Sequence, residues 1–220
     1  MSPSPIQLFG INFSPFVRKV RTVLELKQVP YELVPTNPRE ADDAFYRISP
    51  LRKMPAIIDG DRSLPDSSVI CAYLERKYPS PAALPTDAYE FARSLWFEEY
   101  ADTELVRVFG GHVFVEVVLA EKIFKRPPIQ ADIDLADREE LPHIYSYLEG
   151  ELGSRPCFCG DEPTLGDFAL AGAFLNLRHC DRSPDASQWP KLAAFVKRMN
   201  AHPILARFFA EEEQTLANWA

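Results

Sequence analysis

The sequence predicts an α/β domain followed by an all-helical domain. Strand-like and helix-like segments alternate over the first 80 residues, and prolines gather in "YPSPAALPTD" at 78–87. After that stretch, apolar residues recur at helical spacing almost to the end of the chain. A chain of 220 residues, with 46% hydrophobic and 25% charged residues, is long enough for two domains. We therefore expect domains at 1–79 and 88–220, joined by a linker at 80–87.

In the first domain, the pattern predicts a parallel strand pair that is extended by a hairpin and closed by a helix. Val17, Val20 and Leu24 share one face of the first helix, and "DGD" marks the hairpin turn. The expected strands lie at 6–11, 31–35, 54–59 and 63–65, and the expected helices at 15–28, within 39–49 and at 66–78. This order is typical of a thioredoxin-like domain.

The second domain is predicted to be all helical. Helical spacing runs through 88–124, where the Gly110-Gly111 pair marks an expected bend or break. Further helices are expected at about 131–150, 164–179, 190–198 and 203–212.

The charge is uneven along the chain. Residues 1–78 hold 11 Lys/Arg against 9 Asp/Glu, whereas 79–220 hold 13 against 23, so the parts carry +2 and -10 of the net -8. An acidic chain without a basic stripe argues against nucleic acid or an anionic membrane surface as a partner. The positive first part suits a small anionic ligand instead.

The cysteines and the N-terminus indicate a reducing compartment. Cys71, Cys157, Cys159 and Cys180 have no disulfide-framework spacing, and "CFC" is poor for zinc or a redox pair, so we expect free thiols and no metal site. The N-terminus "MSPSPIQLFG" lacks a basic head followed by an apolar core, and no run approaches the ~18 apolar residues that span a bilayer. A cytoplasmic location is therefore expected.

In "NFSPFVRKV", Ser14 stands where a strand gives way to a helix. Pro15 at the first helical position makes Ser14 the expected N-cap. A hydroxyl that accepts from a backbone N–H can also donate, so Ser14 could hold an anion such as a thiolate at the positive end of the helix. Lowering a thiol pKa from about 8.5 to about 6.5 takes ~2.7 kcal/mol, which a charge-assisted hydrogen bond of ~1.5–3 kcal/mol plus a helix-end contribution of ~0.3–1 kcal/mol can supply. Capping and chemistry both stay open for this residue.

Two further motifs offer contacts for a peptide-like ligand. Met54 precedes a proline, which favours extended geometry and permits a cis bond, so its N–H and C=O can pair with an extended chain. In "LPDSSVICAYL", a helix start with a serine hydroxyl can bind a carboxylate, while the aspartate takes an ammonium. A plain turn and a plain cap are the alternatives.

Together, "FSPFVRKV", "KMPAIIDG", "DSSVICAYL" and "PTLGDFALAG" resemble four motifs of the soluble glutathione transferase family. These are its active-site turn, its cis-proline strand, its glutamyl-binding helix start and its C-terminal capping motif. The resemblance covers nearly the whole chain and keeps the family's order. It implies a thioredoxin-like N-terminal domain, an all-α C-terminal domain, a homodimer and glutathione as co-substrate, with no metal.

The resemblance also implies residue roles. The Ser14 hydroxyl would stabilise the glutathione thiolate. The implied glutathione-binding residues are Lys53 near the glycyl carboxylate, Met54 and Pro55 at the cysteinyl unit, and Asp66 with Ser67 at the γ-glutamyl end. Contacts to the electrophile would come from Asn12, Phe13, Phe16, Tyr100, Glu104, Arg107 and Gly111. Thr164 and Asp167 match the capping box and are expected to support folding.

The sequence departs from the family pattern at the glutamyl end and in its choice of thiol ligand. Many relatives carry glutamate where Asp66 stands, and others use tyrosine or cysteine where this chain has Ser14. The first 70 residues hold no cysteine, which disfavours the branches that work through a mixed disulfide. Asn12 is a second candidate for holding the thiolate.

The function that the resemblance implies is attack of the glutathione thiolate on a small apolar electrophile or a hydroperoxide. A non-catalytic binding or regulatory relative, and a glutathione-dependent isomerase or lyase, are the alternatives.

Overall fold

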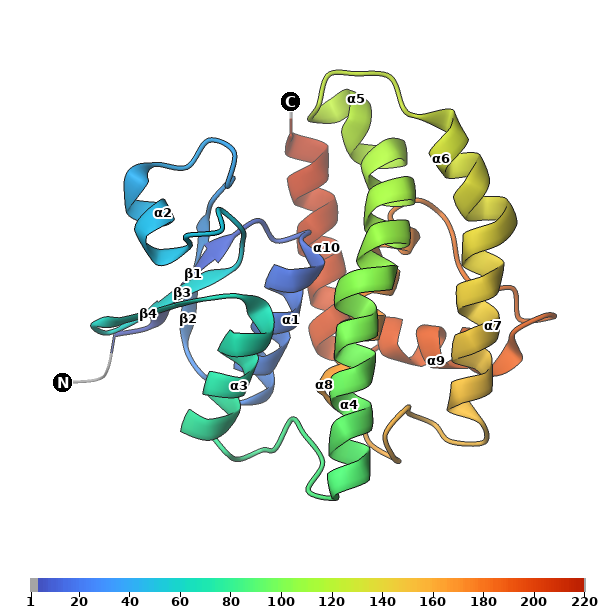
Figure 1. Cartoon of the computed structure of the whole chain (residues 1–220), viewed down its shortest axis with the longest axis horizontal. Coiled ribbons are helices and arrows are strands. Elements are labelled where there is room, and N and C mark those ends of the chain that lie inside the picture. The colour runs from blue at the N-terminus through green and yellow to red at the C-terminus, as the bar shows by residue number, and fades with distance from the viewer. Residues whose placement is uncertain (1–3, 220) are drawn as a thin grey trace. The chain divides into compact units, whose positions relative to one another are not determined.

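The computed structural model describes residues 4–219, which divide into two compact units between Leu84 and Pro85 (Figure 1). Each unit has its own buried apolar core. The division falls inside the stretch 80–87. Across the described residues, no helix is both long and apolar enough to cross a membrane.

The first unit is built on a four-stranded mixed sheet. The strands β1 (Ile6–Gly10), β2 (Tyr31–Pro35), β3 (Ala56–Asp59) and β4 (Arg62–Pro65) lie in the order β2-β1-β3-β4. β1 pairs with β2 in parallel, while β1 with β3 and β3 with β4 are antiparallel. The helices are α1 (Pro15–Leu26), α2 (Asp43–Ile48) and α3 (Ser67–Lys77). The α/β domain expected from the alternating pattern is therefore confirmed.

The core of this unit follows from two periodicities. Alternate residues of β1, Ile6 and Leu8, are buried, as the period of a half-covered strand requires. On α1, the apolar face at Val17, Val20 and Leu24 is fully buried. Residues of both elements thus supply the hydrophobic interior that fixes the turn between them.

A buried lysine ties the end of α1 to the chain that follows α3. The Lys27 ammonium lies 2.6 Å from the Glu75 carboxylate and donates to the carbonyls of Tyr78 and Pro81 at 2.6 and 2.8 Å. Glu75 in turn accepts from the backbone N–H of Ala83 at 3.1 Å. Because the Lys27 side chain has no exposed surface, these partners replace the water that its charge would otherwise bind.

The second unit consists of helices. They are α4 (Ala88–Tyr100), η1 (Ala101–Leu119), α5 (Ala120–Lys122), α6 (Gln130–Leu135), η2 (Ala136–Glu140), α7 (Leu141–Leu152), α8 (Leu165–Arg178), α9 (Pro190–Asn200) and α10 (Pro203–Asn218). The segments η1 and η2 have the wider turns of a π-helix. The all-helical domain is confirmed, and α10 runs past the expected end at 212.

A bend or a break was expected at Gly110-Gly111, and the helix does not break there. η1 passes through both glycines, and α4, η1 and α5 follow one another without an interruption. Glycine costs a helix ~1 kcal/mol relative to alanine, but Phe109 and Val113 beside the pair are fully buried. Burial of such side chains contributes ~1.5–3 kcal/mol each, which outweighs the local cost.

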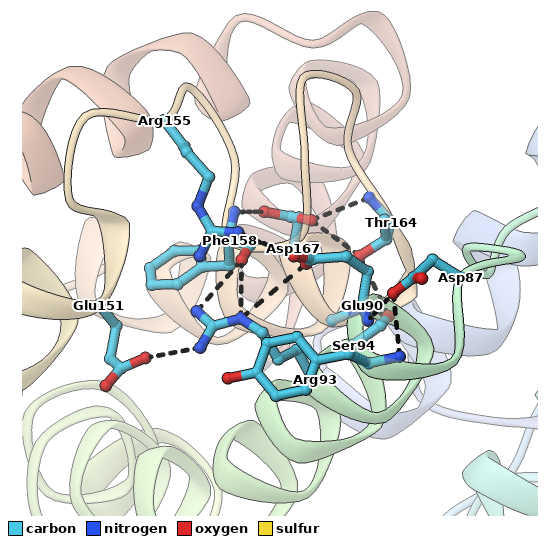
Figure 2. Close-up of polar contacts among 11 residues, drawn as sticks. Asp87, Glu90, Arg93, Ser94, Glu151, Arg155, Phe158, Thr164 and Asp167 are labelled. Atoms are coloured by element: carbon cyan, nitrogen blue, oxygen red, sulfur yellow. Dashed lines mark hydrogen bonds and ion pairs between the residues drawn. The ribbon is translucent and has the colours of Figure 1, made fainter.

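The start of α8 is held by a buried aspartate (Figure 2). Asp167 has no exposed surface and accepts from Phe158 N at 2.8 Å, from Thr164 N at 2.9 Å and from Thr164 Oγ1 at 2.8 Å. Ser94 of α4 donates to Thr164 Oγ1 at 3.0 Å and accepts from Gly166 N at 3.1 Å. A Cβ at Gly166 would lie 2.5 Å from the Ser94 carbonyl oxygen, so only glycine permits this approach. The capping box expected at Thr164 and Asp167 is confirmed.

Candidate functional site

Ser14 occupies the N-cap position of α1. Its N–H donates to Ile11 O at 3.1 Å, and its C=O accepts the first helical bond from Arg18 N at 2.9 Å. The side chain, however, makes no capping hydrogen bond, although the residue is only 6% exposed. Within residues 4–219, the Ser14 hydroxyl has no hydrogen-bond partner, so it is available to a ligand.

The turn that carries Ser14 lies against Met54. Gly10 ends β1, and a Cβ there would lie 2.4 Å from Val17 Cγ2 and 3.4 Å from Met54 Cβ. The N–H of Ile11 points to Met54 Sδ at 3.4 Å. Close packing that only glycine allows therefore brings residues 10–14 beside the segment at 54.

Met54 and Pro55 are joined by a cis peptide bond. The first residue of β3 that pairs with a neighbouring strand is Ala56, so the N–H and C=O of Met54 precede the hydrogen-bonded part of the sheet. Pro55 O accepts from Asp66 N at 3.2 Å, which places these two motifs side by side. Lys53 is exposed, and its backbone N–H and C=O are both bonded to the Ser49 hydroxyl.

Asp66 caps α3 from a strained backbone position. Its φ of 75° lies in a region that costs a non-glycine residue ~1–3 kcal/mol. One carboxylate oxygen, Oδ1, accepts from the N–H groups of Ser68 and Val69 at 3.0 and 3.1 Å. These two bonds use one oxygen of an exposed carboxylate, and the side chain's Oδ2 makes no hydrogen bond within the described part of the chain.

A second buried serine stands at the start of α3. Ser67 is 3% exposed, and its hydroxyl has no hydrogen-bond partner among the described residues. Behind it, the Lys19 ammonium, on a residue 2% exposed, donates to Ser68 Oγ at 3.1 Å. The sequence analysis did not single out Lys19, because its spacing does not reveal that α1 is buried on all sides over 17–24. Helix ends with such N–H groups, hydroxyls and a nearby cation attract anions.

The expected electrophile contacts in the first unit surround the Ser14 turn. Phe13 is buried, and its carbonyl accepts from Arg18 Nη2 at 3.3 Å. Asn12 and Phe16 are half-buried and present surface there.

The expected electrophile contacts in the second unit lie on α4 and η1. Burial raises the pKa of Tyr100 to about 12, so its phenol stays protonated. Arg107 donates to Glu104 at 2.7 Å and to Glu140 at 2.6 Å, and these hydrogen bonds raise the pKa of its guanidinium. Burial alone would raise the pKa of Glu140, but hydrogen bonds from Arg107 and a nearby histidine outweigh it and lower that pKa. Gly111, which lies one helical turn after Arg107 on η1, is half-buried.

The arrangement in the first unit brings together Ser14, Met54, Pro55, Asp66 and Ser67, while the residues of α4 and η1 belong to the other unit. Among residues 4–219, no group of three or more His, Cys, Asp or Glu is placed to hold a metal ion. All four cysteines are buried free thiols.

Comparison with known proteins gives one consistent result. Models of the glutathione S-transferase N-terminal and C-terminal domains match residues 8–82 and 118–203. A glutathione S-transferase of Triticum aestivum is 42% identical over 205 residues, covering 91% of this chain and 84% of that protein. A solved glutathione transferase homologue of Drosophila mojavensis with bound glutathione is 26% identical, with a TM-score of 0.76 over 98% of this chain and 96% of that one. A glutathione S-transferase of Rhodospirillum rubrum shares the fold, with a TM-score of 0.83 at 23% identity over 92% and 91% of the two chains.

Proposed function

Because the chain belongs to the glutathione S-transferase family, we propose that Ser14 activates the thiol of the co-substrate glutathione for attack on a small apolar electrophile or a hydroperoxide. Glutathione transfer is the activity of this enzyme family. The proposal concerns which residues of this chain bind glutathione and activate its thiol. The observation that carries the proposal is the Ser14 hydroxyl, which is nearly buried at a helix N-terminus and is not used for capping.

The chemistry needs a thiolate at neutral pH. A hydrogen bond from the Ser14 hydroxyl to sulfur, together with the positive end of α1, stabilises the anion and lowers the thiol pKa. The sulfur lone pair then forms the new S–C bond while the leaving group departs with its electron pair, and the thiol proton goes to solvent. The rest of the binding site places the sulfur in front of the hydroxyl.

Backbone and helix-end contacts would hold the glutathione chain. The N–H and C=O of Met54, beside Pro55, pair with the cysteinyl unit, as in strand addition. Ser67 and the α3 N-terminus bind the γ-glutamyl carboxylate, and Asp66 Oδ2 takes its ammonium, because Oδ1 is committed to the cap. Lys53 is exposed and reaches the glycyl carboxylate.

Each unit by itself has residues proposed for contact with the electrophile. In the first unit these are Asn12, Phe13 and Phe16. In the second, Tyr100 and Gly111 offer surface, while Glu104 and Arg107 are already paired with each other and would orient a polar substituent only by giving up part of that pairing. The apolar residues of this set favour an aromatic or aliphatic electrophile.

The test is a pH-rate profile of 1-chloro-2,4-dinitrobenzene conjugation in Ser14→Ala. We expect the apparent pKa of bound glutathione to rise from about 6.5 towards about 8.5, and kcat/KM at pH 6.5 to fall about 10²-fold, which is the ~2.7 kcal/mol of lost stabilisation. The exposed Ser63→Ala in the same unit is the matched control and leaves both values unchanged.

Three outcomes would contradict the assignment. An unchanged pKa in Ser14→Ala would make the residue a backbone cap only, and Asn12→Ala would then be examined. Retention on immobilised glutathione with no turnover of aryl halides, isothiocyanates or hydroperoxides would favour a non-catalytic binding protein. Turnover confined to isomerisation or lyase substrates would favour glutathione-dependent work on one metabolite.

We also propose that the protein acts as a homodimer in the cytoplasm. Large apolar side chains are exposed in each unit, including Leu51 at 78%, Tyr89 at 68% and Trp96 at 50%, which is surface that a second copy can bury. Four free cysteines suit a reducing compartment. Light scattering would then give about twice the chain mass of 25.0 kDa, and a monomer at micromolar concentration would refute the dimer.

A further inference from the structure

A groove in the second unit is separate from the residues assigned above. It has a volume of about 410 Å³ and is lined by residues of the end of α8, of α9 and of the connection between them. Its polar lining comes from Arg178, Ser183, Lys197 and Asn200, and its apolar lining includes Pro184 and Val196. The volume is in the range of small-molecule sites.

The charge of this groove is opposite to that of its surroundings. Residues 79–220 hold 13 Lys/Arg against 23 Asp/Glu, yet no carboxylate lines the groove. Some basic side chains elsewhere in the unit are paired with carboxylates: Arg107 lies 2.6 Å from Glu140, and Arg182 lies 2.7 Å from Asp137. The groove therefore gathers two cations, Arg178 and Lys197, without a carboxylate in its lining.

The polar groups of the groove are not used by the protein itself. Within residues 4–219, Arg178 and Lys197 form no ion pair, and the side chains of Ser183 and Asn200 make no hydrogen bond. The connection between α8 and α9 therefore brings four hydrogen-bonding side chains to one cavity without giving them partners.

Arg178 is positioned by an aromatic ring rather than by a carboxylate. Its guanidinium carbon lies 3.6 Å from the ring centroid of Phe209 on α10, and the His179 ring stacks on the same phenyl group at 4.4 Å. A guanidinium that stacks on an aromatic ring contacts the ring through its own flat face, so the N–H groups around the edge of the guanidinium stay free. That edge is the fork that binds two oxygens of a carboxylate or phosphate.

We propose that this groove binds a small oxyanion, with the Arg178 fork and the Lys197 ammonium as its charged contacts. Asn200 and Ser183 add neutral hydrogen bonds to the same oxygens. The lining at Pro184 and Val196 accommodates a short aliphatic body, so a carboxylate with an apolar tail and a bare phosphate share the charged contacts and differ in the tail.

The experiment is a titration of the ¹⁵N-labelled full-length protein, followed by amide chemical shifts, with inorganic phosphate and with hexanoate in separate arms. We expect saturable shifts at amides within 183–201 for at least one anion. Tighter binding of hexanoate would identify an aliphatic carboxylate as the ligand class, and tighter binding of phosphate would identify a phosphate.

Three variants decide whether the named side chains are responsible. Lys197→Gln and Arg178→Gln should each weaken binding about tenfold, because each removes a charge-assisted contact. Lys197 is exposed, so its variant keeps the fold even where Arg178→Gln disturbs the packing on Phe209. Lys191→Gln, an exposed lysine on the same helix and outside the groove, should bind like the wild type.

The proposal is overturned if neither anion saturates any signal in 183–201, or if Lys197→Gln and Arg178→Gln bind like the wild type. Shifts that appear only near Ser14 and Ser67 would also overturn it, because they would place the anion at the glutathione site. Conjugation of 1-chloro-2,4-dinitrobenzene should be unchanged in all three variants, so this result and that of Ser14→Ala can fail independently.

Discussion

Replacing Asp167 by alanine should destabilise the protein more than any change to an exposed aspartate. The carboxylate is fully buried and accepts from two backbone N–H groups, those of Phe158 and Thr164, and from the Thr164 hydroxyl. The hydroxyl can turn towards Ser94, but the two N–H groups lose their acceptor at a fully buried position. At ~1–3 kcal/mol for each buried unsatisfied donor, the free energy of unfolding should fall by about 2–6 kcal/mol.

For a chain of this length, that loss corresponds to a fall in Tm of roughly 5–20 °C. Urea unfolding followed by circular dichroism measures the loss in free energy of unfolding, and Asp185→Ala is the matched control. Asp185 also accepts from a backbone N–H and a hydroxyl, both of Ser187, but it is exposed and water can replace it, so the control should change by less than about 1 kcal/mol. Equal losses in the two variants would refute the reasoning, because burial would then not decide the cost.

Three further results are expected. Gly10→Ala should weaken glutathione binding, since its Cβ would lie 2.4 Å from Val17 Cγ2 and its φ of 156° strains any L side chain; adding Val17→Ala should restore part of the affinity, and wild-type affinity in Gly10→Ala would contradict the reasoning. Lys27→Met should lower the free energy of unfolding by about 3–5 kcal/mol and speed proteolysis near residue 80, because Glu75 loses its partner; unchanged proteolysis would contradict the tether. Burial raises the pKa of Cys157 to about 11, so native protein at pH 8 should react with a thiol reagent at least about 10²-fold more slowly than a free thiol, with all four cysteines reacting once it is unfolded.

Period and turn chemistry were enough to predict most elements. Period-two alternation in β1 predicts its one buried face, and the 3.6-residue stripe on α1 predicts the helix, although α1 is buried on all sides over 17–24. Of the bend or break that local propensity indicated at Gly110-Gly111, the break does not occur, because neighbours such as Phe109 are buried. The end of α10 was placed too early because its last turns carry few apolar residues.

The site was predictable as a set of motifs but not as a hydrogen-bond pattern. Short motifs place Ser14 and Asp66 at helix starts, since capping chemistry is local. Which side-chain atoms remain free for a ligand depends on tertiary structure. The Ser14 hydroxyl does not cap its own helix, whereas Oδ1 of Asp66 does cap α3. Glu140, the distant partner of Arg107, could not have been paired with it from spacing alone.

The ammonium of Lys27 has a consequence for recombining this chain with its relatives. Its acceptors, the carbonyls of Tyr78 and Pro81, lie in a proline-rich stretch that would ordinarily be chosen as a crossover point. A chimera joined at residue 79 would combine the buried ammonium of one parent with the loop of another. With a junction after Leu84, the Lys27 ammonium and its acceptors come from the same parent. Libraries that recombine the two units should therefore place the crossover there.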